Sequence, residues 1–200
     1  MTPAKRIMDI VLAMLLMAIL ALPFGIFLLW LRLTEGPPLF YVSERMRAPG
    51  RPFWLWKLRT MSVAAPEQGV SGGDKRSRIT PTGDFLRHVR LDEVPQLWNI
   101  LKGDMSFVGP RPPLRLYVER FPDLYAQVLR NRPGVTGLAT LVYHSHEERL
   151  LAQCHTVFQT DAVYSRRCVP RKAKIDLIYQ RRRTILMDIK LMMRTLRRAR

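Results

Sequence analysis

The sequence predicts an α-rich α+β protein that is attached to a membrane. Three observations predict this: a long uncharged apolar segment near the N-terminus, a pair of short β-strand patterns after it, and helical patterns through the rest of the chain. The length of 200 residues suits one ordinary domain. Hydrophobic residues make up 48% of the chain, which excludes a disordered protein. Cys154 and Cys168 form no CxxC pair, so neither a zinc site nor a disulfide framework is indicated.

The apolar segment spans residues 10–31, with 22 consecutive residues that carry no charge. This is long enough for a helix to cross the hydrocarbon core, and no small-residue cleavage site of a signal peptide follows it. Basic residues on both sides favour the cytoplasm for both ends. Pro23 near the middle lacks an N–H, so a bent re-entrant helix and a kinked spanning helix both fit. We expect Asp9 to pair with Lys5 or Arg6 on one helix face.

The central part of the chain predicts a small β-hairpin followed by short helices. Residues 39–42 and 53–56 have strand patterns, and Ala48-Pro49-Gly50 between them is typical of a turn. Residues 64–78 are rich in Gly, Ser and charge, which predicts a mobile surface loop or lid. Helices are predicted at 84–88, 92–101, 114–120 and 124–130.

The C-terminal segment 166–200 is strongly basic, with 13 Lys and Arg against two Asp. An apolar stripe recurs there at helical spacing beside a cationic face and consists of Ile178, Ile185, Ile189, Met192 and Leu196. Such an amphipathic helix suits an anionic bilayer surface. The net charge of +17 also predicts a polyanionic partner. Because the chain already carries a membrane segment, we expect membrane lipid and no nucleic acid.

Two adjacent carboxylates, Asp92 and Glu93, stand just before Pro95, a residue accepted in the first turn of a helix. The free N–H groups of a helix N-terminus stabilise negative charge and can hold a phosphate beside a carboxylate. An ionised Asp could then attack phosphorus, while the neighbouring carboxylate holds Mg²⁺. The pattern alone also fits a helix cap with no catalytic role.

Cationic residues in stiff loops favour the phosphate interpretation. Arg111 lies between prolines in Gly109-Pro110-Arg111-Pro112-Pro113, which leaves its guanidinium little freedom to lose on binding a phosphate. Arg132 opens a second stiff segment, Arg132-Pro133-Gly134. Lys57 and Arg59 form a third cationic cluster, although both could be outward-facing residues of a strand.

Taken in order, these segments resemble the bacterial sugar transferases, the monotopic phosphoglycosyl transferases that act on polyprenyl phosphates. The segments that carry the resemblance are Lys5-Arg6-x-x-Asp9, Lys57-Leu58-Arg59-Thr60-Met61, Ile79-Thr80-Pro81-Thr82-Gly83 with Leu86-Arg87, Leu91 to Asn99, Leu101 to Pro112, and Arg132 to Gly137. The chain departs from the family pattern at Arg45-Met46-Arg47 and at Thr136-Gly137-Leu138-Ala139-Thr140. These departures concern contacts to the donor sugar.

The resemblance implies transfer of a sugar-1-phosphate from a UDP-sugar donor to a polyprenyl phosphate acceptor, undecaprenyl phosphate, with release of UMP. Asp92 matches the nucleophile and Glu93 the partner carboxylate for Mg²⁺ and phosphate. Arg111, Arg87, Arg59, Lys57 and Arg132 are then the expected phosphate-binding residues.

The resemblance also implies a re-entrant membrane helix in residues 1–35, broken near Pro23. A catalytic domain in residues 36–200 would then lie on the cytoplasmic face of the bacterial inner membrane, with several short amphipathic helices at the interface. A homo-oligomer is left open. Two other functions remain: a membrane-tethered basic module for anionic lipid or nucleic acid, and a UDP-sugar glycosyltransferase that releases UDP.

Overall fold

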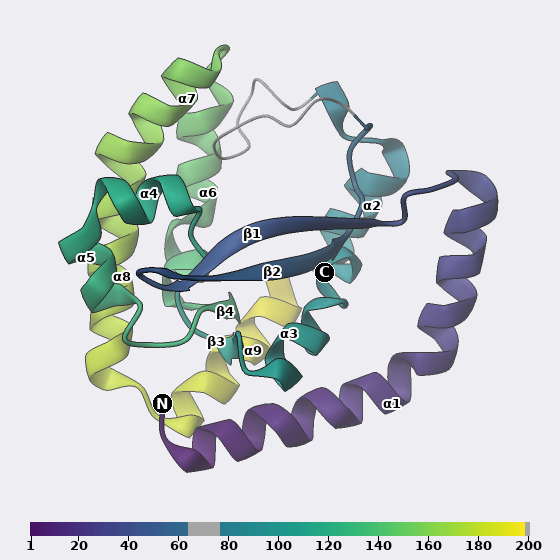
Figure 1. Ribbon diagram of the computed structural model, residues 1–200, viewed down its shortest axis with the longest axis horizontal. Coiled ribbons are helices and arrows are strands. Elements are labelled where there is room, and N and C mark those ends of the chain that lie inside the picture. The colour runs from purple at the N-terminus through teal and green to yellow at the C-terminus, as the bar shows by residue number, and fades with distance from the viewer. Residues whose placement is uncertain (64–76, 199–200) are drawn as a thin grey trace.

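A computed structural model describes residues 1–63 and 77–198 of the chain (Figure 1). The predicted loop at 64–78 lies outside the described residues except for its last two positions. The helices are α1 (Pro3–Thr34), α2 (Pro81–Val89), α3 (Gln96–Lys102), α4 (Arg115–Arg120), α5 (Pro122–Val128), α6 (Leu138–Ala152), α7 (Val157–Val163), α8 (Val169–Arg182) and α9 (Ile185–Arg198), with a 3-10 turn η2 (Leu91–Glu93) and a π turn η3 (Tyr164–Cys168). The strands are β1 (Phe40–Ala48), β2 (Arg51–Leu58), β3 (Ser106–Val108) and β4 (Gly134–Thr136). The predicted α-rich α+β class is confirmed.

α1 is a 32-residue helix that bends within its length, so that it follows the bottom and then the right side of Figure 1. Thr2 caps its start, and Pro3 occupies the first turn. Pro23 lies inside the helix, where it removes a backbone donor. The chain stays helical through Pro23, so the predicted break is a bend in a continuous helix.

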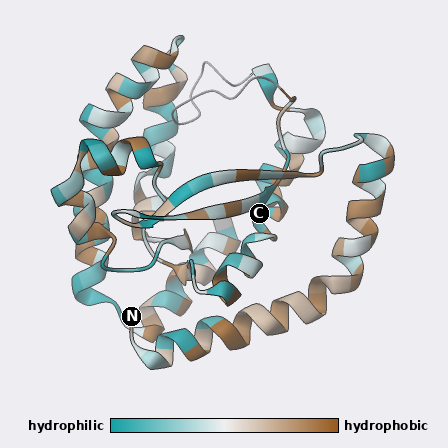
Figure 2. Cartoon of the chain, in the orientation of Figure 1, coloured by the Kyte–Doolittle hydropathy of each residue, from teal (hydrophilic) through white to brown (hydrophobic). Residues whose placement is uncertain are grey.

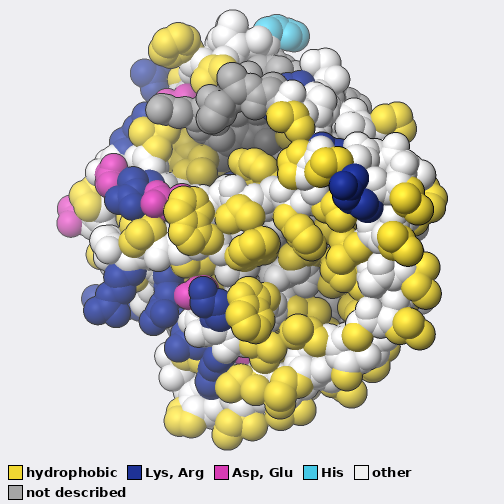
Figure 3. All heavy atoms as spheres, turned by 45° about the vertical axis from the view of Figure 1, so that its right-hand side comes forward, with side chains coloured by type: hydrophobic (Ala, Val, Ile, Leu, Met, Phe, Trp, Pro, Cys, Tyr) yellow, Lys and Arg dark blue, Asp and Glu magenta, His cyan; other side chains and the backbone are white. Residues whose placement is uncertain are grey.

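Many apolar side chains of α1 face outward, although Ala13 and Leu31 are buried against the protein. The helix is long and apolar enough to cross a membrane, and few residues of its most apolar stretch are buried. Figure 2 shows the apolar colour along the helix, and Figure 3 shows these side chains forming a broad hydrophobic surface. A core helix would bury this surface, so α1 has the exposure expected of a helix in contact with lipid.

The polar residues at the start of α1 attach it to the rest of the protein. Lys5 Nζ pairs with Asp188 Oδ2 of α9 at 2.6 Å. Arg6 donates to the carbonyl oxygens of Ile100 and Leu101 at the end of α3, at 2.6 and 2.8 Å. The Asp9 side chain is fully buried and accepts from the backbone N–H of Phe107 at 3.3 Å. The predicted pairing is therefore confirmed only in part: burial raises the pKa of Asp9 and the charge of Lys5 opposes this, while the ion pair of Lys5 is with Asp188 and Arg6 contacts α3.

The predicted hairpin is present, with longer strands than the sequence indicates. β1 pairs with β2 in antiparallel register, and Pro49-Gly50 form the turn. Asn99 of α3 holds the outer edge of β2: its side-chain amide donates to the carbonyl of Trp54 at 2.7 Å and its oxygen accepts from the N–H of Trp56 at 3.2 Å. Asn99 is fully buried, so these bonds fix the hairpin against α3.

The C-terminal basic segment forms two helices and not one. α8 ends at Arg182 and α9 begins at Ile185, so Ile178 does not share a helix with the other members of the predicted stripe. On α9, Asp188 and Leu191 face the protein. The outward apolar face of α9 comprises Ile185, Leu186, Ile189, Met193 and Leu196. This exposed face agrees with the predicted amphipathic character.

Asp176 of α8 gives the fold a pH-dependent stability. It is 7% exposed, and burial raises its pKa to about 7. The unfolded chain titrates near 3.9, so the folded state binds an extra proton and stability falls as pH rises from about 4 through 7. We expect Asp176→Asn to remove this decline and to raise the free energy of unfolding at pH 8 by about 4 kcal/mol, measured by unfolding in detergent. Asp123→Asn, at an exposed site on α5, should keep the decline. If the stability of Asp176→Asn still fell with pH as in the parent, Asp176 would not be the residue responsible.

Candidate active site

Asp92 and Glu93 lie side by side in the 3-10 turn between α2 and α3. α2 ends at Val89 and is followed by Arg90, whose backbone is left-handed with φ of 59°. This sharp change of direction places the next three residues in η2. The sequence predicts both carboxylates in the first turn of a helix spanning 92–101, but α3 begins only at Gln96, after Pro95. Because α3 begins after the two carboxylates, their negative charge is compensated by side-chain cations and not by the backbone amides of α3.

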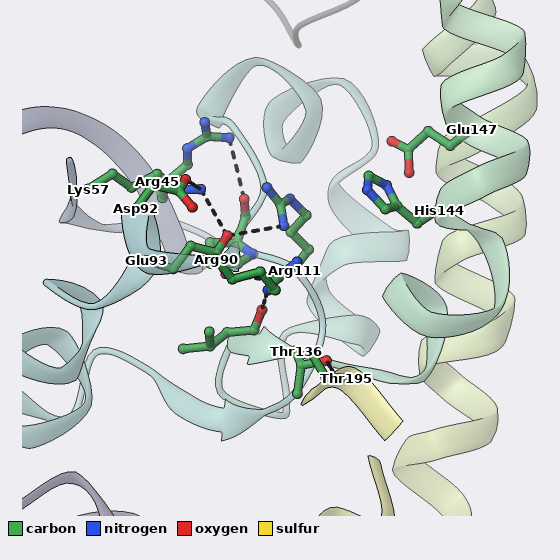
Figure 4. Close-up of polar contacts among 12 residues, drawn as sticks. Arg45, Lys57, Arg90, Asp92, Glu93, Arg111, Thr136, His144, Glu147 and Thr195 are labelled. Atoms are coloured by element: carbon green, nitrogen blue, oxygen red, sulfur yellow. Dashed lines mark hydrogen bonds and ion pairs between the residues drawn. The ribbon is translucent and has the colours of Figure 1, made fainter. Parts of the chain in front are cut away.

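Glu93 is a buried anion with three cations around it. Its Oε1 lies 3.0 Å from Lys57 Nζ and 3.8 Å from Arg111 Nη1, and its Oε2 accepts from Arg90 (Figure 4). Burial by itself would raise the pKa of Glu93, but Lys57, Arg90 and Arg111 together lower it to about 2. Glu93 therefore stays ionised at all physiological pH values and fixes the positions of the three cations.

Asp92 is less strongly compensated than its neighbour. It is 7% exposed, and the distance from its Oδ2 to Lys57 Nζ is 3.7 Å. Burial raises the pKa of Asp92, and the Glu93 charge adds to this effect, against the opposing charges of Lys57, Arg90 and Arg87. Two adjacent carboxylates thus have opposite shifts. A desolvated carboxylate with a raised pKa is the better candidate for a nucleophile.

Arg111 is held at the site by the second pair of strands, β3 and β4. These strands are parallel, and the Gly109 N–H donates to Thr136 O at 2.9 Å while the Gly134 N–H donates to Pro110 O at 2.8 Å. A Cβ on Gly134 would lie 2.1 Å from the Gly109 nitrogen, so this close approach requires glycine. The Arg111 side chain is 45% exposed, which leaves its guanidinium open to a ligand.

The other three predicted cations lie in different environments. Arg87 donates to Thr60 Oγ1 at 2.8 Å, and burial lowers its pKa while Asp92 opposes this shift, which places it within electrostatic reach of the carboxylates. Arg59 instead donates to the carbonyl oxygens of Glu35 and Gly36, both at 3.1 Å, after the end of α1. Arg132 lies next to Gly103, beyond the end of α3. The structure therefore brings Lys57, Arg87 and Arg111 to the site but neither Arg59 nor Arg132.

Sequence reasoning misses Arg90 as a site residue. Nothing in the motif around Leu91 to Asn99 separates Arg90 from an ordinary surface arginine, because its role depends on a left-handed backbone.

His144 and Glu147 of α6 face the site from the opposite side in Figure 4. Their contacts are with close neighbours, since His144 lies 3.4 Å from Glu148 and Glu147 lies 2.9 Å from Lys172.

The donor set at Asp92 and Glu93 can be compared with what Mg²⁺ requires. Within residues 1–63 and 77–198, no third His, Cys, Asp or Glu joins them to form a metal cluster. Mg²⁺ in proteins is held by one or two carboxylates together with substrate phosphates and water. Asp92 has one cationic partner within 4 Å in the described part of the chain, which leaves its oxygens available. Asp92, with Glu93 beside it, fits a Mg²⁺ ion that arrives with a phosphorylated substrate.

The chain is similar in sequence to known proteins. The sequence profile described as "Bacterial sugar transferase" matches residues 1–199. A putative undecaprenyl-phosphate N-acetylgalactosaminyl 1-phosphate transferase of Bacillus subtilis is 42% identical over 120 residues, which is 60% of this chain and 67% of that protein. A UDP-glucose:undecaprenyl-phosphate glucose-1-phosphate transferase of Escherichia coli is 31% identical over 96% of this chain and 39% of its own length. An undecaprenyl-phosphate galactose phosphotransferase of Salmonella typhimurium is 37% identical over 67% of this chain and 31% of its own length.

Proposed function

The chain belongs to the bacterial sugar transferase family, and from this premise we propose that it transfers a sugar-1-phosphate from a UDP-sugar to undecaprenyl phosphate and releases UMP. The similar proteins are named for this class of transfer and differ in the sugar, so the sugar is left open. The observation that carries the proposal is the unequal compensation of the two carboxylates. Glu93 is held by three cations, while the more weakly paired Asp92 stands next to them.

In the first step, an Asp92 carboxylate oxygen attacks the β-phosphorus of the donor. The bond from this phosphorus to the oxygen that bridges the two phosphates breaks, and UMP leaves with the electron pair. The sugar-1-phosphate is then bonded to Asp92. In the second step, a phosphate oxygen of the acceptor attacks the same phosphorus and displaces the Asp92 carboxylate. The product is a polyprenyl diphosphate sugar.

The cations of the site support binding of a diphosphate. Lys57, Arg87, Arg90 and Arg111 outnumber the two carboxylates, so the site carries excess positive charge for an anionic donor. Arg111 is exposed and presents a planar guanidinium to phosphate oxygens. Asp92 and Glu93 would hold Mg²⁺ with the donor phosphates. When bound, Mg²⁺ supplies positive charge that offsets the charge of the reacting phosphate oxygens.

The membrane helix explains how one site reaches both substrates. A bent α1 that enters and leaves the same face would keep the nucleophile at the surface of the bilayer, where the phosphate of a lipid acceptor lies. We place the catalytic residues on the cytoplasmic face of the inner membrane, because basic residues flank the apolar segment on both sides. The outward apolar face of α9, with Lys190 and Arg194 beside it, would rest on anionic lipid.

Nucleotide release tests the proposal. Detergent-solubilised protein is incubated with Mg²⁺, undecaprenyl phosphate and a set of UDP-sugars, and we expect it to release UMP with at least one donor. Repeated turnover should require the acceptor, because only the acceptor frees Asp92 again. Release of UDP would indicate glycosyl transfer. No nucleotide from any donor would favour a binding module and would overturn the proposed transfer.

A further inference from the structure

A basic cavity lies away from the two carboxylates. It has a volume of about 440 Å³ and is enclosed by the start of α1, the tip of the β1–β2 hairpin and the segment before β4. Ten described residues line the cavity, and none of these ten is acidic. Five of the ten are arginines: Arg6, Arg47, Arg51, Arg130 and Arg132. Such a concentration of one charge needs an explanation, because a solvated protein surface usually mixes both signs.

Arg6 and Arg132 meet at Gly103, the residue that ends α3. A Cβ built on Gly103 would lie 3.3 Å from Arg6 Nη2 and 3.3 Å from Arg132 Nη1, so two guanidinium groups converge on one point. Arg6 is satisfied by the carbonyl oxygens at the end of α3. Arg132 Nη1 is buried and has no hydrogen-bond partner among the described residues. Burial lowers the pKa of Arg132, and the charges of Arg6 and Arg47 add to this effect.

Two carboxylates act on Arg132 from outside the cavity lining. The charges of Asp9 and Asp104 oppose the lowering of the Arg132 pKa, but neither residue lines the cavity. Within residues 1–63 and 77–198, no carboxylate pairs with Arg47 or Arg51 at the hairpin tip. The cavity therefore contains five arginines and no acidic lining residue. An anion bound there would relieve the repulsion among them.

We propose that this cavity is a second binding site for a phosphate-bearing anion. The planar donors of arginine match phosphate oxygens, and the five arginines supply several such donors to one cavity. The site is separate from the carboxylate pair, because Lys57 lies six positions after Arg51 of the hairpin tip along β2, a distance of about 20 Å in an extended strand. The cavity also lies at the start of α1, the membrane helix, so the phosphate can come from a lipid headgroup or from a soluble compound.

Hydrogen exchange in the full-length protein can test the site. We expect pyrophosphate, or phosphatidylglycerol in nanodiscs, to slow exchange in residues 46–52 and 128–134 of the parent protein. The triple variant Arg47→Gln, Arg51→Gln, Arg130→Gln should need about tenfold more of the effective anion for the same protection. Protection at residues 90–94 by pyrophosphate should be the same in the parent and the triple variant, since Arg47, Arg51 and Arg130 are remote from the two carboxylates.

The control is the double variant Arg166→Gln, Arg182→Gln, which removes exposed arginines from η3 and α8. It should retain the protection of residues 46–52. Protection by pyrophosphate identifies a soluble ligand, and protection by phosphatidylglycerol but not phosphatidylcholine nanodiscs identifies a lipid headgroup. Protection by neither anion, or equal protection of the parent and the triple variant, would overturn the proposal.

Discussion

Replacing Asp92 with Asn is expected to abolish turnover, by at least about 10⁴-fold, without unfolding the protein. The amide has the shape of the carboxylate but cannot attack phosphorus to give the acyl phosphate. Burial already raises the pKa of Asp92, so the fold disfavours its charged form and a neutral side chain should leave the unfolding temperature unchanged or higher. UMP release and thermal unfolding, both in detergent, measure the two effects.

Trapping of the intermediate gives a sharper readout for Asp92. Incubation with a UDP-sugar in the absence of acceptor should add the mass of one sugar phosphate to the parent protein and nothing to Asp92→Asn. Asp123→Asn, an exposed substitution on α5, should behave as the parent does. A folded Asp92→Asn protein that still turns over would remove Asp92 as the nucleophile.

The raised pKa of Asp92 also predicts the acid side of the pH profile. Only the ionised carboxylate attacks, so activity should fall on acidification at a pH above the range of an ordinary Asp. Glu93, with its pKa near 2, contributes nothing to this limb. If activity fell only in the pH range where an unperturbed Asp titrates, the unequal compensation of Asp92 and Glu93 would be contradicted.

Replacing Glu93 with Gln is expected to lower the rate by about 10²- to 10³-fold and to destabilise the protein by about 3 kcal/mol. The substitution leaves Lys57, Arg90 and Arg111 without the anion that holds them together. We also expect a higher Mg²⁺ concentration for half-maximal activity, because one of the two candidate carboxylate ligands is lost. Rates across a Mg²⁺ titration, with thermal unfolding in parallel, measure these effects.

Glu119→Gln is the matched control for Glu93→Gln, since Glu119 is 63% exposed and pairs with Arg115 on the surface. It should change neither the rate nor the Mg²⁺ titration. Glu93→Asp serves where Glu93→Gln folds poorly, because it keeps the charge and shortens the reach, and it should recover stability while remaining slow. A normal rate and Mg²⁺ requirement in Glu93→Gln would exclude Glu93 from the site.

Features with a strong local signal could be predicted from the sequence. The hairpin follows from strand patterns around Pro49-Gly50, and α2 to α5 correspond to the four predicted helices within a few residues. Asp92, Glu93, Lys57 and Arg111 are brought together as the motifs indicate. These residues lie in segments whose local chemistry, such as proline at a helix start or between stiff turns, already restricts the backbone.

Features that depend on tertiary contacts could not be predicted in this way. β3 and β4 have three residues each and exist because they pair across the fold. The break between α8 and α9 at Arg183-Thr184 has no glycine or proline to mark it. Arg59 and Arg132 carry the same charge as Arg111, and only the fold directs them away from the carboxylates. Side-chain direction is set by long-range packing, which a single sequence does not show.

The link between Lys5 and Asp188 has a consequence for biosynthesis. It joins residues that are 183 positions apart, and Asp188 also accepts from the Tyr179 hydroxyl at 2.5 Å. During translation, α1 emerges before α9 and can enter the membrane before α9 is made. The Lys5 ammonium must therefore remain hydrated or neutralised elsewhere until α9 leaves the ribosome, so the catalytic part docks onto its own anchor only after α9 has been synthesised.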